Sequence, residues 1–388
     1  MNKEQKEKVE KRREIEPDQS DKNKSDTHDK ASKAEKAARS RSHKNYNSYY
    51  YSVVIISFVI IVIASVIYTY IEKRPAPDTV FIIDSKEIET HNNGNFGFKR
   101  GNIEMFLNKS LVDIKYMFSS ELFSQNPRLG WCPDDQSNIP ENYNFYESYP
   151  QCKQPPLNQL NTSSAYAMAL IKMYESRYCR TTNQTIQLSA QHILSCDKIN
   201  DNENGGNVYD AIKFVETSKI IPVECFPLSL NANTSCLKKC SNPSEMYEVL
   251  DMCALQDEEK IKREIYVNGT VITRFTVYTD FLSYKSGIYY TTPSAYRYGR
   301  PHVVQVIGWG IENGQKYWVI ENTWGEEWGI GGLAKVGIVG KEDCGISQVG
   351  LAIVPNLNQK AFIKDSQPST GEPSYETGKS SEPDSIEE

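Results

Sequence analysis

Histidine is the side chain in this sequence best suited to acid–base chemistry near neutral pH, because its ordinary pKa is close to 6.5. Five histidines are present. Two lie in a highly charged N-terminal stretch, His91 lies in a short segment beyond an apolar run, and His192 lies in the helix-like run SAQHILSC. Only His302 precedes a strand-like run, in RPHVVQVIGWG, and Asn322 follows twenty residues later in ENTWGEEWG. An imidazole oriented by a side-chain amide is typical of the acid–base group that serves a nucleophile.

The elements around these residues indicate a two-part domain. The run ALIKMYESRY after Ala165 consists of good helix formers with apolar residues at helical spacing, and Ser163 and Ser164 stand where a helix N-cap belongs. Farther along, the runs TRFTVYTDF, HVVQVIGWG and QKYWVIEN are β-branched and aromatic and are separated by Gly or Asn turns. A helical half followed by a strand-rich half predicts an α+β fold with a cleft between the two lobes.

A single membrane-spanning helix is expected near the N-terminus. Residues 1–50 are crowded with charge and have almost no large apolar side chain, which predicts a disordered tail. Residues 51–71 are uncharged and rich in Ile and Val, and a helix of this length matches the roughly 30 Å hydrocarbon core of a bilayer. The alternative is a cleaved signal peptide, which the long polar stretch before the apolar run disfavours. Because Lys and Arg dominate residues 33–44, the N-terminus should stay cytoplasmic, as in a type II membrane protein.

The rest of the chain is then expected in the lumen of the secretory or endolysosomal system, including the lysosome, or outside the cell. All nine cysteines lie beyond the apolar run, as they should in an oxidising compartment. The same part holds five glycosylation sequons, at Asn108, Asn161, Asn183, Asn233 and Asn268. It divides into residues 75–138 and 139–357, and residues 361–388 are an acidic stretch that we expect to be disordered.

Two classes of function are disfavoured by composition and spacing. The net charge is −6, and no basic patch interleaved with aromatic residues lies outside the N-terminal tail, so nucleic acid is not an expected partner. The sequence also lacks the His and Cys spacing of zinc sites, so no metal and no cofactor are expected.

Several motifs in the right order resemble the papain family of cysteine proteases, and cathepsins B and C within it. The stretch NQLNTSSAYAMAL has the layout of the papain signature, and YPQCKQPPLNQ, ESRYC, KREIYVNGTVITRFTVYTDFLSYKSGIYY and VIGWGIENGQKYW resemble segments of cathepsin B. ECFPLSLNANTSCLKKC and Tyr166 resemble cathepsin C. The resemblance covers about 220 residues and implies the papain-like two-lobed fold. Residues 75–138 resemble, more weakly, the propeptide of cathepsin B.

The resemblance assigns a role to each residue of the site. It implies that Gln159 is the oxyanion donor, His302 the acid–base group and Asn322 the residue that orients it. The thiol nucleophile would fall at position 165, which here is Ala165. The positions that would line the substrate cleft are Gly205, Gly206, Ser163, Trp324 and Val349.

A protease-like chain without its thiol is predicted to be a pseudoprotease that retains a peptide-binding cleft. Its expected partners are peptides, proteases or protease inhibitors, besides the membrane. Two alternatives remain: an active peptidase that uses Ser164 as an unconventional nucleophile, and a structural or adhesion scaffold. Ser164 is one residue short of position 165, which turns a helical side chain by about 100°.

The resemblance also implies disulfide pairing and the fate of the propeptide-like segment. It implies that Cys152 pairs with Cys179, and it leaves three cysteines unassigned, namely Cys132, Cys253 and Cys344. The other implied pairs are Cys196 with Cys236 and Cys225 with Cys240. Without a thiol of its own, the chain cannot remove residues 75–138 itself, and the hypothesis is that they stay attached and occupy the groove.

Overall fold

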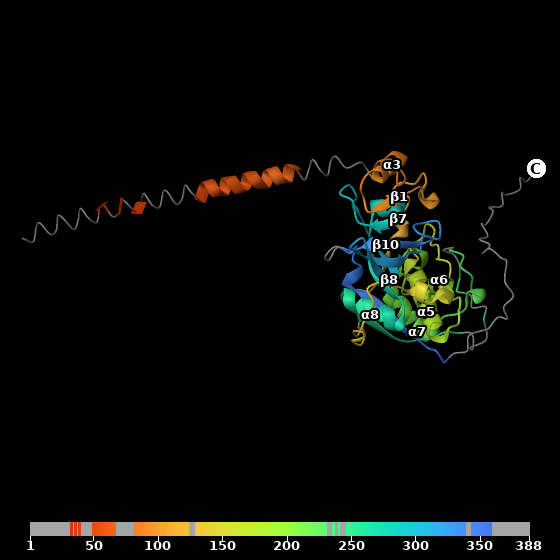
Figure 1. The fold of residues 1–388 in the computed structure, drawn as a ribbon. Helices are drawn as coiled ribbons and strands as arrows, with labels where there is room; N and C mark the ends of the chain where they lie inside the picture. The colour runs from red at the N-terminus through yellow and green to blue at the C-terminus, as the bar shows by residue number, and fades with distance from the viewer. Residues whose placement is uncertain are drawn as a thin grey trace, which may run out of the picture. The chain divides into compact units, whose positions relative to one another are not determined.

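The computed structural model describes residues 32–33, 35–36, 38–39, 49–66, 81–123, 129–230, 235–236, 240, 246–338 and 343–358. The chain forms two separate units, Met1–Pro75 and Ala76–Glu388 (Figure 1). The predicted tail at 361–388 lies outside the described residues.

The first unit contains one described helix that is long and apolar enough to cross a membrane, at Tyr49–Val66. It overlaps the predicted span at 51–71, whose last five residues lie outside the described part. Within the stretch expected to be a tail, the described residues at 32–39 are helical, with Arg39 paired to Glu35 one turn away. The Ala, Lys and Glu content of this piece explains the helix, because these residues have high helix propensity.

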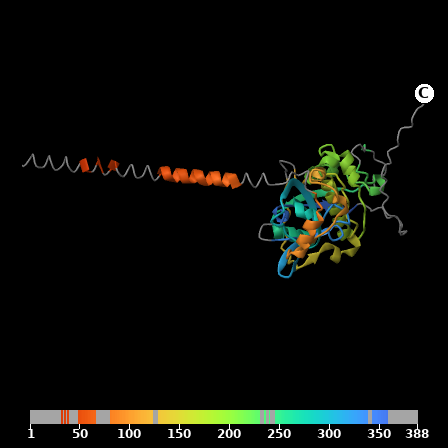
Figure 2. The same cartoon turned by 90° about the horizontal axis from the view of Figure 1, so that it is seen from above.

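The helical lobe of the second unit is built around α5 (Ala165–Thr182). Every residue of α5 from Ala165 to Cys179 is buried, because α6 (Ala190–Cys196), α7 (Val208–Ser218) and the sheet surround it. Figure 2 shows these helices, in yellow and green, gathered on one side of the unit. Because α5 is packed on all sides, it holds the residues of its first turn in fixed positions.

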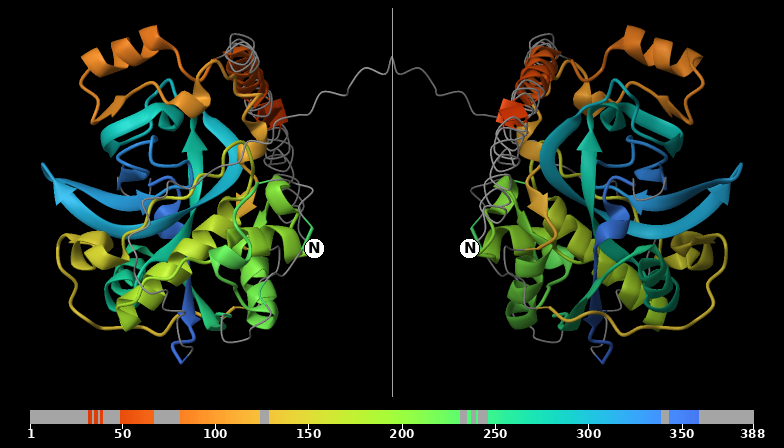
Figure 3. Two further views of the ribbon diagram at one scale, coloured as in Figure 1. Left: turned by 90° about the vertical axis from the view of Figure 1, so that its right-hand side faces the viewer. Right: turned by 90° about the vertical axis from the view of Figure 1, so that its left-hand side faces the viewer.

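The strand lobe is a nine-stranded sheet in the order β1-β7-β10-β9-β8-β6-β11-β5, with β3 paired to β8 off this path. Its central strand is β8 (Arg297–Glu312), which pairs antiparallel with β6 (Val271–Tyr278) and β9 (Gln315–Glu321) (Figure 3). The remaining strands are β1 (Phe98–Arg100), β3 (Tyr143–Asn144), β5 (Val249–Leu255), β7 (Tyr284–Tyr289), β10 (Leu333–Gly337) and β11 (Gly350–Pro355). The α+β fold predicted from the sequence is therefore present, and β8 contacts α5 where the two lobes meet.

Smaller helices complete the unit. They are α3 (Ser85–Asn93), α4 (Phe145–Ser148) and α8 (Glu258–Asn268), together with 3-10 helices at Glu104–Phe106, Lys115–Met117, Pro150–Cys152, Asn202–Asn204, Val223–Cys225, Thr279–Ser283 and Ile346–Gln348.

The N-terminal segment, defined here as residues 81–123, packs on both lobes. Strand β1 pairs antiparallel with β7 at the edge of the large sheet. Strand β2 (Ser120–Glu121) pairs parallel with β4 (Gly206–Asn207) of the helical lobe. Several apolar residues of the N-terminal segment, among them Phe106, Ile114 and Phe118, are fully buried and belong to the same core as β6 and β8. The segment is thus an integral part of the second unit.

Eight cysteines form disulfides. Cys152 is joined to Cys179, and the pairs Cys196–Cys236 and Cys225–Cys240 are the other two that the resemblance implies. Cys132 is bonded to Cys253, and Cys344 is a free thiol.

Candidate active site

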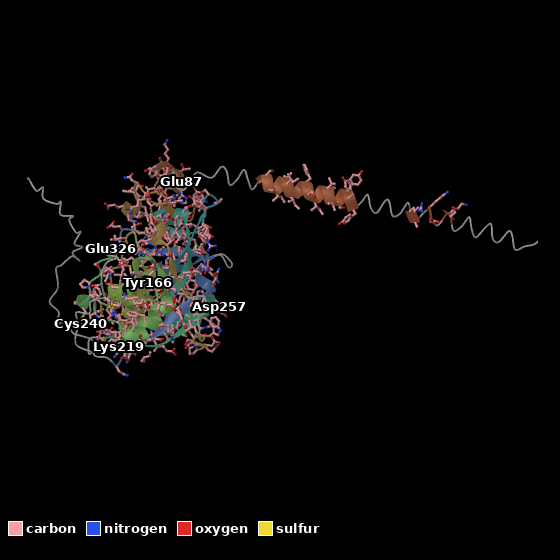
Figure 4. The ribbon with its side chains drawn as sticks, turned by 180° about the vertical axis from the view of Figure 1, so that it is seen from behind. Glu87, Tyr166, Lys219, Cys240, Asp257 and Glu326 are labelled. Atoms are coloured by element: carbon pink, nitrogen blue, oxygen red, sulfur yellow. A yellow bond between two sulfur atoms is a disulfide. The ribbon has the colours of Figure 1, made fainter. Side chains whose placement is uncertain are left out.

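The first residue of α5 is Ala165, and its side chain is completely buried. Ser164 precedes it as N-cap residue, but the expected side-chain cap is absent. The backbone of Ser164 has φ −84° and ψ 5°, outside the extended region that capping requires. Instead, the Ser120 hydroxyl of the N-terminal segment accepts the backbone N–H of Tyr166 at 3.2 Å. Tyr166, labelled in Figure 4, lies within the helical lobe.

Strands β8 and β9 bring His302 and Asn322 together from twenty residues apart. His302 Nε2 lies 2.9 Å from Asn322 Oδ1, and the same oxygen accepts the backbone N–H of Thr323 at 2.9 Å. The N–H of Thr323 identifies this atom as the amide oxygen, which can only accept hydrogen bonds. His302 Nε2 must therefore donate its proton to it, which leaves Nδ1 of the neutral ring with its lone pair. Among the described residues, His302 Nδ1 has no hydrogen-bond partner although it is buried.

Two aromatic rings exclude water from this pair. Trp324 stacks on His302 with ring centroids 5.3 Å apart and an interplanar angle of 27°. Phe118, from the N-terminal segment, meets the imidazole edge-on at 5.8 Å and also packs on Trp324 at 5.9 Å. Burial lowers the pKa of His302 to about 4, and the hydrogen bond with Asn322 opposes this shift only in part. The imidazole is therefore neutral at pH 7.

Gln159 is fully buried beside these residues and its amide is fully engaged. Nε2 donates to the carbonyl of Met117 at 2.8 Å and also to the carbonyl of Thr162. Oε1 accepts the hydroxyl of Thr323 at 2.6 Å, which fixes the orientation of the amide. The amide expected to stabilise an oxyanion is thus bonded to a backbone carbonyl of the N-terminal segment.

Residues 116–123, named here the cleft strand although only Ser120–Glu121 form a β-strand (β2), run along the positions expected to bind substrate. Gly206 N–H donates to the carbonyl of Ser119 at 3.0 Å, within the β2–β4 pairing. Gly205 has φ +141°, and a Cβ on it would lie 2.5 Å from the carbonyl oxygen of Ser119, so only glycine fits this close approach. Ser163 accepts the Ser120 hydroxyl on its carbonyl at 2.8 Å and donates its own hydroxyl to Tyr116.

The structure places the other predicted residues as follows. Val349 is half-buried and packs against the core of the helical lobe, to which Leu122 of the cleft strand also belongs. Ser164 Oγ is 2.7 Å from Thr162 Oγ1, and it also contacts Met168 Sδ one turn farther along α5. Neither contact couples the serine to the imidazole, so this geometry does not support Ser164 as a nucleophile.

Four of the predicted sequons are described and exposed, at Asn108, Asn161, Asn183 and Asn268, while Asn233 lies outside the described residues. Asn161 lies two residues from Gln159, so a glycan there would stand near the cleft. In the described part of the chain, no group of three His, Cys, Asp or Glu side chains is placed to hold a metal ion.

Sequence reasoning missed the residues with which the N-terminal segment fills the cleft. Met117, Phe118 and Ser120 contact Gln159, His302 and α5, respectively. The only signal was the apolar pair Met117–Phe118 near the end of the propeptide-like motif, and such a pair is equally typical of ordinary core packing.

A helical lobe and a strand lobe that meet at a buried His–Asn pair, a Gln amide and a helix N-terminus define the architecture of a cysteine protease. Residues 139–354 match the sequence profile described as papain family cysteine protease, and the chain belongs to this family.

The curated relatives of the chain include cathepsin B and cathepsin B-like proteins. The chain is 30% identical over 238 residues to cathepsin B of Dictyostelium discoideum, an alignment covering 56% of this chain and 75% of the relative. It is 28% identical over 228 residues to cathepsin B-like CP2 of Giardia intestinalis, with the same coverage. Among solved structures, procathepsin B S9 of Trypanosoma congolense superposes with a TM-score of 0.65 at 25% identity, over 72% of this chain and 100% of that one.

Proposed function

We propose that this chain is a catalytically inactive papain-like peptidase homologue that acts by binding peptides, proteases or protease inhibitors in its cleft. The observation that carries the proposal is His302 Nδ1, a buried lone pair without a partner in the described residues. In a working site this nitrogen would face a thiol at the start of the helix. Ala165 supplies only a methyl group there.

The missing thiol removes the covalent step and leaves the groups that assist it. Gln159, His302 and Asn322 can orient and polarise a bound carbonyl, but none of them attacks it. In subtilisin, loss of the nucleophile lowers kcat by about 10⁶. Because Ala165 offers no nucleophile for His302 to activate, we expect no measurable peptide hydrolysis.

The site retains Gly205 and Gly206 along one edge, where an extended peptide backbone can pair with the chain. The pairing of Gly206 with Ser119 and Ser120 supports this reading, since an edge that holds one backbone can hold another by main-chain hydrogen bonds. Access for any other peptide requires the cleft strand to leave, because it covers His302 and engages Gln159. The N-terminal segment is thus proposed to be the propeptide-like occupant of the cleft.

The proposal also includes anchoring of the chain in a membrane by a single helix. The exposed apolar helix at Tyr49–Val66 supports a single-pass anchor, and the Lys- and Arg-rich residues before it support a cytoplasmic N-terminus. The four disulfides beyond the helix support a lumenal or extracellular domain in the secretory or endolysosomal system.

The test uses the full chain in detergent, with a specific protease site placed at residues 124–128 so that the N-terminal segment can be cut and washed away. Peptide hydrolysis and the binding of a fluorescent peptide are then measured before and after cutting. We expect no hydrolysis in either state and peptide binding only after cutting. Hydrolysis that persists in a Ser164→Ala variant and after removal of contaminating proteases would contradict inactivity. Absence of binding after cutting would favour the scaffold alternative.

A further inference from the structure

The disulfide between Cys132 and Cys253 joins the stretch that follows the N-terminal segment to the peptidase-fold domain. Cys132 lies nine residues after Phe123 and seven residues before position 139, where the family match begins. Cys253 lies on β5 within the domain, 121 residues farther along the chain. The bond therefore holds the chain up to Cys132 to the domain even when the backbone between Cys132 and residue 139 is cut.

The main chain around Cys132 is also fixed to β5. Cys132 N–H donates to the carbonyl of Ala254 at 2.8 Å, and Ala254 N–H donates to the carbonyl of Gly130 at 2.9 Å. Since β5 is the last strand in the sheet order, these bonds cover an edge that would otherwise stay open. Cys132 itself is buried, so the linkage is a packed part of the domain surface.

The connecting loop, defined here as residues 133–138, directly follows Cys132 and, unlike that buried residue, lies mostly at the surface. It has no helix or strand, and all its residues are exposed except Asp135, which is half-buried. Exposed loops of this kind are preferred sites of proteolytic cutting. A protease that cuts in this loop would leave Cys132 on the N-terminal fragment.

We propose that the Cys132–Cys253 disulfide keeps the N-terminal segment attached to the domain after the connecting loop is cut, so that the cleft strand remains its tethered occupant. The inference rests on the proposed function for the role of the cleft, but it concerns how the occupant is retained. A tether converts rebinding into an intramolecular step with an effective concentration of about 1 mM. At about 1 μM protein, this favours the occupied cleft about a thousandfold over a segment released into solution.

The first experiment compares two cut positions in the full chain in detergent. One variant carries a specific protease site in place of residues 134–138, after Cys132, and its matched control carries the site at residues 124–128, before it. After complete cutting, the fragments are separated by denaturing electrophoresis without reductant. We expect the first variant to run as one species that separates only after reduction by a thiol, and the control to separate without reduction. Separation of the first variant without reductant would overturn the proposal.

The second experiment asks whether the tether keeps the cleft covered. The variant cut at residues 134–138 is compared with the same variant carrying Cys132→Ser and Cys253→Ser, which leaves no unpaired thiol from this bond. After washing at about 1 μM protein, hydrogen exchange is measured in the peptide that contains Gln159. We expect protection to persist in the disulfide-bonded protein and to fall at least tenfold in the double variant. Equal loss of protection in both proteins would overturn retention, whichever result the hydrolysis assay gives.

Discussion

The side-chain amide of Gln159 donates a hydrogen bond to the backbone carbonyl of Met117 at 2.8 Å. Gln159 is the group expected to stabilise an oxyanion, and Met117 belongs to the chain's own N-terminal segment. The amide therefore holds a carbonyl that is part of the fold, in the place where a foreign peptide would have to bind. This contact links the propeptide-like segment to the chemistry of the site.

Replacing Gly205 by alanine should loosen the cleft strand. The added Cβ would stand 2.5 Å from the carbonyl oxygen of Ser119 at a φ of +141°. Strain of this kind costs about 1–3 kcal/mol, and here it falls on the pairing of the cleft strand. Limited proteolysis should cut the N-terminal segment faster in Gly205→Ala than in wild type. Gly314→Ala is the matched control, because Gly314 also has positive φ but its Cβ would meet nothing within 4 Å. Equal proteolysis in both variants would contradict the prediction.

Phe118→Ala should destabilise the second unit and admit water to the imidazole. Phe118 is fully buried against His302 and Trp324, and truncation of a buried Phe costs about 3–5 kcal/mol. Urea unfolding measures this loss, and NMR should show the pKa of His302 moving upward from about 4 as its cover is removed. Phe81→Ala is the control on the same segment, since Phe81 is 58% exposed and should cost little.

Comparison of the sequence with the structure shows which features can be predicted from local patterns. The helix after Ala165 followed from the helical spacing of apolar residues, and the strands around His302 followed from β-branched and aromatic runs between turns. The His302–Asn322 pair followed from the order of the family's motifs. The bond between Cys132 and Cys253 could not be predicted, because it depends on how residues 121 positions apart come together in the folded chain. The side chain of Ser164 was misjudged because its backbone angles, and the competing Thr162 hydroxyl, are properties of the packed turn.

Burial of His302 makes stability depend on pH in a defined direction. Its pKa falls from the ordinary 6.5 to about 4 on folding, so between these values the unfolded chain binds a proton that the folded chain does not. The stability from the neutral imidazole is fully present above pH 6.5 and is lost toward pH 4, by about 3 kcal/mol. Relative to His302→Gln, wild type should lose stability across this window. A difference between the two that is constant from pH 7 to pH 4 would rule this out.

Burial of Glu175 should change the pH dependence of folding stability in the direction opposite to that of His302. It is buried on α5, accepts the backbone N–H of Leu188 at 2.8 Å, and has its pKa raised to about 7, mainly by burial. The folded chain therefore holds a proton that the unfolded chain releases above about pH 4.5, and stability falls as pH rises from 4.5 through about 7 and then levels off. Glu175→Gln keeps an acceptor for Leu188 and should stabilise the protein by about 3 kcal/mol at pH 8, but not at pH 4. Thermal unfolding at the two pH values tests this; equal shifts at both would refute it.

We propose that Ala165 alone separates this site from that of a working protease. The most direct measurement is peptide hydrolysis by Ala165→Cys beside wild type, each cut at residues 124–128 and freed of the N-terminal segment. We expect wild type to be inert and Ala165→Cys to cleave at least about a thousandfold faster, with activity abolished by adding His302→Ala. If Ala165→Cys is folded, binds peptide and still fails to cleave, the remaining groups are not catalytically competent and the claim is wrong.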